Sequence, residues 1–502
     1  MIHEQIRGEI SSGDSRSPSR DSSIEVYGFL NSIIGLGETA RLLVKSLRAV
    51  GCAVRPMAVP LKGRKRISFT GEELPGSIPS DQARLRILHL NPEHIAEIHS
   101  LVPDGFFSSV PVVIVPYWET ENIPRAAIAQ ACHFDEVWCT TRFLAEAFGK
   151  GFGIPLRSFP APLAIPASGG YAVGERFRFD DRFVFLFSFD YFSCIKRKNP
   201  DGLCEAFVRA FPVQEPGGPV LVVKSTHAEE HPTQDIYLKL RFCGRKDILF
   251  IDGILADDER AALFQRCNAY VSLHRSEGLG MTILEAMAIG KPCIATAYSG
   301  NLDFTLPEHS YPIPFRKTRI GPGSIHYPPE EEWADPDLDA AATAMRECVM
   351  NPAEAGAKGL KAGEWVAEHH RFEAVGGILL GMIDDLLARP HDAAAKQRRL
   401  DEAGASNQQF PGNQASAAYA LLRQARDRIK AAEDLLDAVP KKQQPLRDAC
   451  RQLARSNRLL AASISGTLKA QKEAAAKRTG EQAIKEHFDM LVMKAIADKL
   501  RG

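Results

Sequence analysis

Two carboxylates on either side of a glycine-rich turn are the residues of this chain with the clearest capacity for chemistry. Glu277 and Glu285 are separated by seven residues, and the turn begins directly after Glu277. A strand-like run, NAYVSLH, precedes the turn, and a helix-like run, MTILEAMA, follows it. The first turn of a helix exposes unpaired N–H groups and a partial positive charge, so it can hold a diphosphate or the sugar attached to one. The residues expected to line that group are Gly278, Leu279, Gly280, Met281 and Thr282.

The elements that must position these residues alternate between strand-like and helix-like runs. From Ile24 onward the runs IEVYGFL, ETARLLVKSLRAVG, CAVRPMAV, LRILHL and VPVVIV follow one another, which predicts parallel βαβ units. A stretch rich in Pro, Gly and Ala at 155–174 interrupts the series, and a second series follows. We therefore predict an α/β chain with two Rossmann-like, doubly wound domains that face each other across a cleft, at 24–170 and 171–388.

The two ends of the chain differ in composition from these domains. The start, 1–23, is polar, lacks the apolar run of a secretion signal and is expected to be disordered. A polar linker is predicted at 389–415. Apolar residues then step by three and four over 416–502, which predicts a helical bundle or coiled-coil extension. From 391 to the end there are 21 Lys and Arg against 13 Asp and Glu. Self-association, a partner protein and an anionic membrane surface all remain open as roles for this basic extension.

Composition excludes several classes of protein. The chain of 502 residues has a formal net charge of zero, 45% hydrophobic residues and 25% charged residues. Zero net charge gives no polybasic argument for nucleic acid, and no apolar run reaches the length of about 18 residues that a membrane span needs. The ten cysteines form no CxxC pair, so neither a zinc site nor a disulfide framework is indicated. We expect a cytoplasmic protein with reduced thiols, with contact to the inner face of the membrane as an alternative.

The segment EGLGMTILE at 277–285 resembles the E-x7-E motif of family-4 glycosyltransferases and their relatives with the GT-B fold, including a bacterial subgroup. The resemblance covers roughly residues 24–388. It implies that Glu277 binds hydroxyls of the transferred sugar and that Glu285 binds the ribose of the nucleotide. It also implies an acceptor site in the first domain, a donor site in the second and retention of anomeric configuration.

Further site residues follow from the same resemblance. Lys198 lies in a predicted loop before a helix, and Lys224 follows a predicted buried strand; both are implied to stabilise the leaving diphosphate, with Arg197 as a substitute. Relatives often carry an arginine several residues before the lysine, where this chain has Phe192 or Ser193. The stretch YGFLNSIIGLGETAR resembles the first loop of the family, in which Gly35 and Gly37 would let backbone approach the donor phosphates.

Other residues carry two interpretations each. Glu119 is a candidate for orienting an acceptor hydroxyl, and His89 or Asn91 for lining the pocket, although a structural role is as consistent with each of them. Asp335 and Asp337 match the D-x-D pattern that binds a metal in the other major glycosyltransferase fold. They precede a helix-like run, so we interpret them as a helix start and predict no metal site.

The predicted reaction moves a hexose from a nucleotide-diphosphate sugar to an acceptor hydroxyl by front-face substitution, without a metal or another cofactor. The nucleotide, GDP or UDP, and the acceptor, a glycan, a glycolipid or a protein, stay open. A nucleotide-sugar epimerase of the same fold is one alternative. An inactive GT-B scaffold that recruits partners through its helical extension is another.

Overall fold

The computed structural model describes residues 23–61, 83–99, 101–165, 177, 179, 181–321, 324 and 327–407. These residues fall into two compact units. The first unit holds both parallel sheets, whereas helix α8 (Pro232–Arg241) belongs to the second unit. The predicted extension 416–502 and the predicted N-terminal segment, apart from Ser23, lie outside the described residues.

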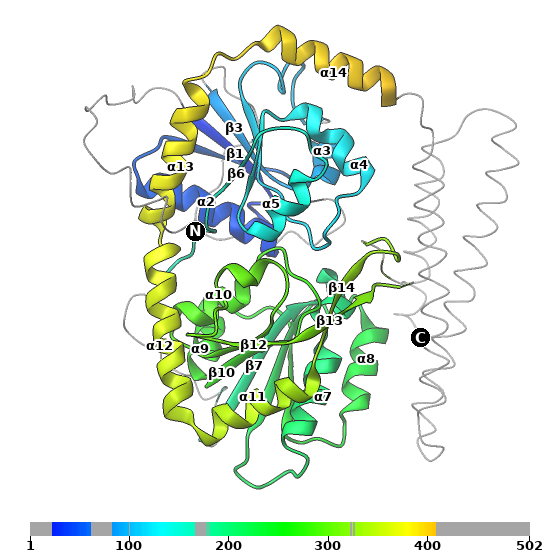
Figure 1. Ribbon diagram of the computed structural model, residues 1–502, viewed down its shortest axis with the longest axis vertical. Coiled ribbons are helices and arrows are strands. Elements are labelled where there is room, and N and C mark those ends of the chain that lie inside the picture. The colour runs from blue at the N-terminus through cyan, green and yellow to red at the C-terminus, as the bar shows by residue number, and fades with distance from the viewer. Residues whose placement is uncertain are drawn as a thin grey trace, which may run out of the picture. The chain divides into compact units, whose positions relative to one another are not determined.

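The first sheet has six parallel strands in the order β2-β1-β3-β4-β5-β6. Its four inner strands are buried almost throughout, as expected for a parallel sheet covered on both faces, whereas the two edge strands are partly exposed. We call this sheet with its helices the N-terminal lobe (Figure 1). The strands are β1 (Ser23–Gly28), β2 (Val54–Ala58), β3 (Ala83–His89), β4 (Val112–Ile114), β5 (Glu136–Cys139) and β6 (Leu156–Ser158). The helices between them include α2 (Gly35–Ala49), α3 (Ile95–His99), α4 (Arg125–Ile128) and α5 (Arg142–Gly149).

The second sheet is also parallel and runs in the order β12-β11-β10-β7-β8-β9. The chain leaves β7 toward β8 on one side and later adds β10 on the other, so β7 and β10 form the switch point of the sheet. Ligands of such sheets bind at the carboxyl ends of the strands at this point. The strands are β7 (Val184–Asp190), β8 (Val220–Thr226), β9 (Ile248–Asp252), β10 (Ala269–Ser272), β11 (Cys293–Thr296) and β12 (Tyr311–Ile313).

The second sheet and its neighbouring elements form the C-terminal lobe. Its helices are α6 (Ile195–Lys198), α7 (Pro200–Ala210), α9 (Asp257–Arg266), α10 (Met281–Ala288), α11 (Leu338–Met350) and α12 (Pro352–His369). Strands β13 (Phe315–Arg319) and β14 (Glu332–Pro336) pair antiparallel beside it. The two parallel sheets confirm the predicted Rossmann-like domains.

The D-x-D triplet has the structural role that its position predicts. Asp337 is the N-cap of α11, and its side chain accepts hydrogen bonds from the backbone N–H groups of Asp339 and Ala340. Asp335 forms an ion pair with Arg275. The prediction of a helix start is confirmed.

The last helix of the predicted second domain packs on the first one. Helix α12 ends at His369, and the chain then forms a separate helix, α13 (Phe372–Leu387). Val375, Leu379 and Ile383 of α13 are buried in one apolar cluster with residues of β1, α2, β3 and β4. The yellow helices in Figure 1 show this return from one lobe to the other. The predicted boundary at 388 is therefore wrong for residues 372–387, because the apolar face of α13 is buried by α2 and not by the second sheet.

The predicted linker contains a helix. Residues of α14 (Ala393–Asn407) occupy half of the stretch that its polar composition marked as a linker. Lys396 is fully buried in this helix, and its ammonium lies 2.6 Å from Asp135 of the N-terminal lobe. His391, just before α14, bonds the Ser108 carbonyl group at 2.8 Å. An ion pair and hydrogen bonds hold this polar helix, which is why apolar periodicity does not reveal it.

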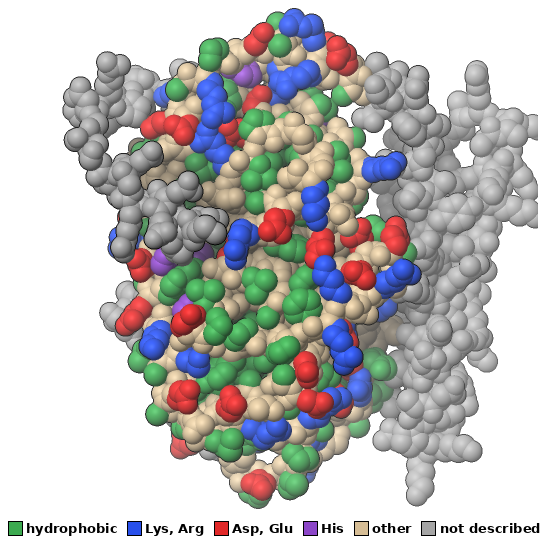
Figure 2. All heavy atoms as spheres, viewed as in Figure 1, with side chains coloured by type: hydrophobic (Ala, Val, Ile, Leu, Met, Phe, Trp, Pro, Cys, Tyr) green, Lys and Arg blue, Asp and Glu red, His purple; other side chains and the backbone are tan. Residues whose placement is uncertain are grey.

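The surface and the helices agree with the composition. Acidic and basic side chains are interspersed over the face shown in Figure 2, in keeping with the net charge of zero. Among the described helices, none combines the length and the apolar character that crossing a membrane requires. The described residues likewise contain no group of three or more His, Cys, Asp and Glu side chains arranged to bind a metal.

The close packing of α13 on α2 predicts opposite effects at two adjacent glycines. A Cβ on Gly376 would lie 2.4 Å from the Ser46 carbonyl oxygen and 2.7 Å from Val50 Cγ1, whereas a Cβ on Gly377 would meet nothing within 4 Å. Gly376→Ala should therefore destabilise the fold by about 1–3 kcal/mol through overpacking. Gly377→Ala should stabilise it by up to ~1 kcal/mol through helix propensity. Urea unfolding of both variants measures this, and an equal response at the two positions would contradict the packing.

Candidate functional site

The turn between β10 and α10 is fixed by its glycines. Gly280 is the N-cap of α10 with φ +89°, a left-handed conformation that favours glycine. Gly300 packs so tightly under the turn that a Cβ there would lie 2.2 Å from the Gly278 carbonyl oxygen. Its backbone N–H donates to the Glu277 carbonyl group at 2.9 Å. Helix α10 begins at Met281, so the backbone N–H groups of its first turn are directed at the carboxyl end of the sheet, as the sequence predicts.

Glu277 lies at this turn as a buried carboxylate between two cations. Lys198 Nζ is 2.5 Å from its Oε1 and Arg197 Nη1 is 3.0 Å from its Oε2. Burial by itself would raise the pKa of Glu277, but the charges of Lys198 and Arg197 outweigh it and hold the pKa at about 2. Glu277 is therefore an anion throughout the physiological pH range. It can accept hydrogen bonds, but it cannot supply a proton.

The two cations come from a single helical turn with strained ends. Cys194 before α6 and Asn199 after it have φ values of +65° and +55°, which is uncommon for residues other than glycine. Asn199 compensates by capping α7 through Gly202 N and by donating from Nδ2 to the Leu273 carbonyl group at 2.8 Å. Lys198 is thus the last residue of α6 and not part of a loop, and Asn199 ties it to the carboxyl end of β10.

Glu285 pairs with a basic residue of helix α9. Arg260 of α9 donates from Nη1 to Glu285 Oε1 at 2.7 Å. Burial is the largest influence on Glu285 and raises the pKa of this carboxyl group, while Arg260 opposes the rise. Glu38, in the first turn of α2, is close enough to raise it further. The second carboxylate of the motif therefore lies where α9, α10 and the start of α2 meet.

Lys224 belongs to the same region as Glu285. It lies within β8, one residue before Ser225, and is 7% exposed. Burial lowers the pKa of Lys224 to about 8, and the neighbouring charges are Asp190, Arg260 and Asp252. The charges that act on Lys198 are instead Glu277, Arg197 and Glu119. The structure therefore places the two predicted lysines in separate clusters, one at each end of the motif.

The first loop of the N-terminal lobe approaches the donor side through a helix and not through a glycine loop. Helix α2 already begins at Gly35, so both predicted glycines belong to its first turn. A Cβ on Gly37 would lie 2.5 Å from the Phe29 carbonyl oxygen, which gives this glycine a packing role. A Cβ on Gly35 would meet nothing within 4 Å. Of the two, Gly35 is the one that leaves space for a ligand.

Residues from both lobes meet at the turn. Thr141, the N-cap of α5, donates from Oγ1 to the Gly278 carbonyl group at 3.0 Å. A Cβ on Gly278 would lie 3.2 Å from the Trp118 carbonyl oxygen. Glu119 lies 3.7 Å from Arg197. The N-terminal lobe therefore contacts the turn with the loop that contains Trp118 and Glu119.

The other candidates of the N-terminal lobe are a buried histidine and an asparagine that bonds to a loop. His89 is fully buried at the end of β3, which lowers its pKa to about 4 and keeps the imidazole neutral. Asn91 accepts a hydrogen bond from Tyr117 N at 2.8 Å and so fixes the loop that leads to Glu119. Neither observation assigns a general base.

Two residues of the site escape sequence reasoning altogether. Arg260 has the appearance of a surface residue on an amphipathic helix, and Glu38 that of an ordinary acidic residue in a first helical turn. Only the folded structure, which brings Arg260 and Glu38 near Glu285, shows that both charges act on this carboxylate. A basic residue at this point of α9 carries no motif that could have identified it.

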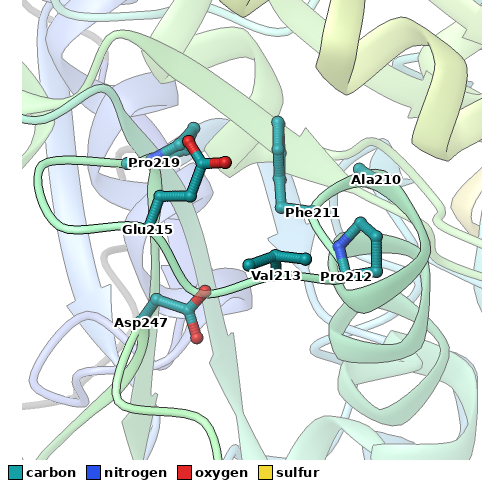
Figure 3. A pocket seen from close by; sticks show the side chains of 8 residues that line it. Ala210, Phe211, Pro212, Val213, Glu215, Pro219 and Asp247 are labelled. Carbon is teal, nitrogen blue, oxygen red and sulfur yellow. The ribbon is translucent and has the colours of Figure 1, made fainter.

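The hollow shown in Figure 3 does not belong to this site. It is lined at one end of α7 and at the residues that precede β8 and β9. Pro219 and Asp247 stand directly before these strands, so the hollow lies at the amino ends of a parallel sheet. The motif carboxylates and Lys198 lie at the carboxyl ends. The lining residues are Ala210, Phe211, Pro212, Val213, Glu215, Gly218, Pro219 and Asp247.

Comparison with known proteins agrees with this geometry. Residues 193–309 match the family described as Glycosyl transferases group 1. The matched segment begins just before α6 and includes Lys198, Lys224, Glu277 and Glu285. It confirms a glycosyl transferases group 1 domain in this part of the chain. A search of curated proteins finds no match.

Solved structures show the fold of the whole two-lobe region. Sucrose-phosphate synthase (tll1590) from Thermosynechococcus elongatus aligns with a TM-score of 0.54 at 17% identity, covering 73% of this chain and 99% of that protein. HepE (Alr3699) of Anabaena, in complex with UDP and glucose, aligns with a TM-score of 0.54 at 12% identity, covering 72% and 100%. A glycosyltransferase from Rickettsia africae ESF-5 aligns with a TM-score of 0.53 at 12% identity, covering 74% and 100%. The predicted GT-B fold is thereby confirmed.

The buried cluster around Glu277 predicts strong coupling between its members. Glu277→Gln leaves Lys198 and Arg197 without their counter charge, and breaking a buried pair in this way costs about 3–5 kcal/mol. Lys198→Met should also destabilise the fold, but the double variant should lose less than the sum, with a coupling on the order of 1–3 kcal/mol. Urea unfolding of the four proteins gives the cycle. Glu205→Gln, which removes the exposed pair with Arg209 on α7, is the matched control and should change little. Additive losses at Glu277 and Lys198 would contradict the ion pair.

Proposed function

We propose that this chain is a retaining glycosyltransferase that transfers a hexose from a nucleotide-diphosphate sugar to an acceptor hydroxyl. One observation carries the proposal. A buried carboxylate held ionised by Lys198 and Arg197 stands directly before the first turn of α10, inside the segment that matches the glycosyl transferases group 1 family. A sugar ring offers hydroxyl donors to such a carboxylate, and a diphosphate is an anion for the helix N-terminus.

The two charge clusters divide the donor between them. We assign the sugar hydroxyls to Glu277 and the ribose hydroxyls to Glu285, with the diphosphate at residues 278–282. Glu285 is the fifth residue of α10, which puts it about 6 Å further along the helix axis than Met281. This separation fits a donor whose sugar and ribose lie on either side of a diphosphate. Lys198, Lys224 and the free N–H groups of α10 offset the charge that develops on the leaving group.

The reaction requires no protein nucleophile in this proposal. The bond between C1 of the sugar and the phosphate oxygen breaks, and the acceptor oxygen forms its bond to C1 on the same face. The acceptor proton passes to the departing phosphate, so the products are the glycoside and the nucleoside diphosphate. Because the pKa of Glu277 is about 2, this residue does not act as a general acid, which supports a positioning and electrostatic role. Neither a metal nor a separate cofactor is part of the proposal.

The relatives suggest which donors to try first. HepE is described in complex with UDP and glucose, so UDP-glucose is the first probe and GDP-mannose the second. The wild-type chain should bind UDP or GDP, and its melting temperature should rise accordingly. If none of UDP, GDP, UDP-glucose and GDP-mannose stabilises the folded chain, the proposed donor class is wrong.

The separate roles of the two carboxylates can be measured. Glu277→Gln should leave the affinity for the free nucleotide nearly unchanged, but it should lower the affinity for the nucleotide sugar by about tenfold or more, because hydrogen bonds from the sugar hydroxyls to a charged acceptor become weaker bonds to a neutral one. It should also slow donor cleavage by about 100-fold or more. Glu285→Gln should lower the affinity for the free nucleotide and for the nucleotide sugar by similar factors.

Calorimetric titration and release of free nucleotide from the donor give these values, with the melting temperature as a check on folding. Glu205→Gln on α7 is the control. Equal loss of nucleotide binding in Glu277→Gln and Glu285→Gln would show that the assignment of sugar and ribose is wrong.

Lys224 predicts a pH dependence of donor binding. Its pKa of about 8 means that the cation is lost as the pH rises through 8, well below the usual range for lysine. The affinity of the free enzyme for the donor should therefore fall above pH 8. In the complex with the donor the pKa of Lys224 should be higher, because the diphosphate stabilises the ammonium. Lys224→Arg stays charged at every pH used, so its donor affinity should not fall above pH 8. If the affinity of that variant still falls, a group other than Lys224 causes the pH dependence.

A further inference from the structure

Arg197 lies between carboxylates that come from the two lobes. Its side chain is nearly completely buried, with 4% of the residue exposed. Nη1 donates to Glu277 Oε2 at 3.0 Å and to the Ser276 carbonyl group at 2.7 Å. Nη2 lies 3.7 Å from Oε1 of Glu119, which belongs to the N-terminal lobe. The guanidinium group therefore connects Glu277 to an acidic residue of the opposite lobe.

These contacts do not suit the role of leaving-group stabiliser that the sequence implies for Arg197. Nε donates to the Ser193 carbonyl group at 3.1 Å, so all three guanidinium nitrogens lie against protein groups. A phosphate would have to displace these partners from a buried position. Lys198, which reaches Glu277 from the other side and keeps 15% of its side chain exposed, is better placed to meet an incoming anion.

We propose that Arg197 is a positioning residue that fixes Glu277 toward the donor sugar and links it to Glu119 of the acceptor lobe. The inference rests on the proposed function, since it concerns how the same carboxylate is held. A planar guanidinium suits this task because it can satisfy several acceptors in fixed directions at once. Glu119 reaches Arg197 only when the loop with Trp118 lies against the turn. Contact between the lobes therefore completes the set of groups that orients Glu277.

Among the described residues, the titratable groups that act most strongly on Glu277 and its cations can be named. Lys198 and Arg197 approach from α6, His274 from the segment that follows β10, and Glu119 acts on the pair from the N-terminal lobe. His274 is fully buried and hydrogen bonded to Asn301 at 2.9 Å. It is present in every protein compared below, so a difference between those proteins reports the loss of the guanidinium charge.

The first experiment needs no substrate. The pKa of Glu277 is depressed below its usual value of 4.5, so its ionisation contributes stability that is present above about pH 4.5 and is lost as the pH falls toward 2. Arg197→Gln removes one of the two cations, so the pKa of Glu277 in the folded protein should rise toward 4.5, and less stability should be lost between pH 4.5 and pH 3 than in the wild type. Arg197→Lys should restore most of the wild-type profile. Urea unfolding between pH 3 and pH 7 measures it.

The second experiment uses UDP, UDP-glucose, GDP and GDP-mannose as probes. Arg197→Gln should lower the affinity for the nucleotide sugar by about tenfold relative to the affinity for the free nucleotide. Arg197→Lys should recover only part of this affinity. Glu119→Gln should cause a smaller loss in the wild type and none in the Arg197→Gln background, because the effect passes through the guanidinium. Arg142→Gln is the matched control: it removes another ion pair between the lobes, the one with Asp303, at an exposed position.

The outcomes separate the inference from the proposed function. If Arg197→Gln and Arg197→Lys both lower the free energy of unfolding by the same amount at every pH, Arg197 is only a packing residue. That result would overturn the proposal. If Arg197→Gln loses affinity for the free nucleotide and for the nucleotide sugar equally, Arg197 binds the diphosphate. That result would overturn the proposal as well. If the wild type binds none of the four probes, the proposed function fails, while the pH profile still decides whether Arg197 keeps Glu277 ionised.

Discussion

The arrangement of this molecule depends on keeping one carboxylate charged in a buried position. Desolvation opposes the anion of Glu277, and it is stable only because Lys198 and Arg197 approach from opposite sides. Both cations come from one helical turn, α6, whose ends adopt left-handed conformations at Cys194 and Asn199. That local strain persists because Asn199 bonds to α7 and to the end of β10. The backbone at the switch point thus holds two cations next to one carboxylate.

The parallel sheet explains why these groups meet although they are far apart in sequence. Strands β7 and β10 are neighbours, so α6, which follows β7, and the turn that follows β10 leave the sheet at the same edge. The seven residues between Glu277 and Glu285 then set how far apart the two carboxylates lie along α10. One cluster, with Glu277 and Lys198, forms at the turn, and the other, with Glu285, Arg260 and Lys224, forms further along the helix. A ligand with two polar ends and a central anion is complementary to this pattern.

Sequence reasoning located the local parts of the site and missed those that depend on packing. The glycine turn, the start of α10 at Met281 and the helix start at Asp337 follow from residue types and spacing, because each is determined within a few neighbouring residues. The engagement of Arg197 with Glu277 and the action of Arg260 on Glu285 depend on which helices pack together, and no periodicity encodes that choice. The same limit applies to α13, because its apolar face could pack on either sheet. It also applies to α14, because this helix is held by the buried ion pair of Lys396, which an apolar pattern cannot reveal.

The contacts between the lobes differ in strength from one side of the molecule to the other. Near the turn they are polar and partly exposed, as in the pairs Arg142–Asp303 and Lys317–Glu121, and exposed ion pairs contribute little stability. Helix α13 instead buries an apolar face in the core of the N-terminal lobe, which cannot be separated without exposing that surface to water. Separation of the lobes is therefore least costly on the side where the proposed donor site lies. The pair of Arg197 and Glu119, with 3.7 Å between Nη2 and Oε1, lies on this same side of the molecule.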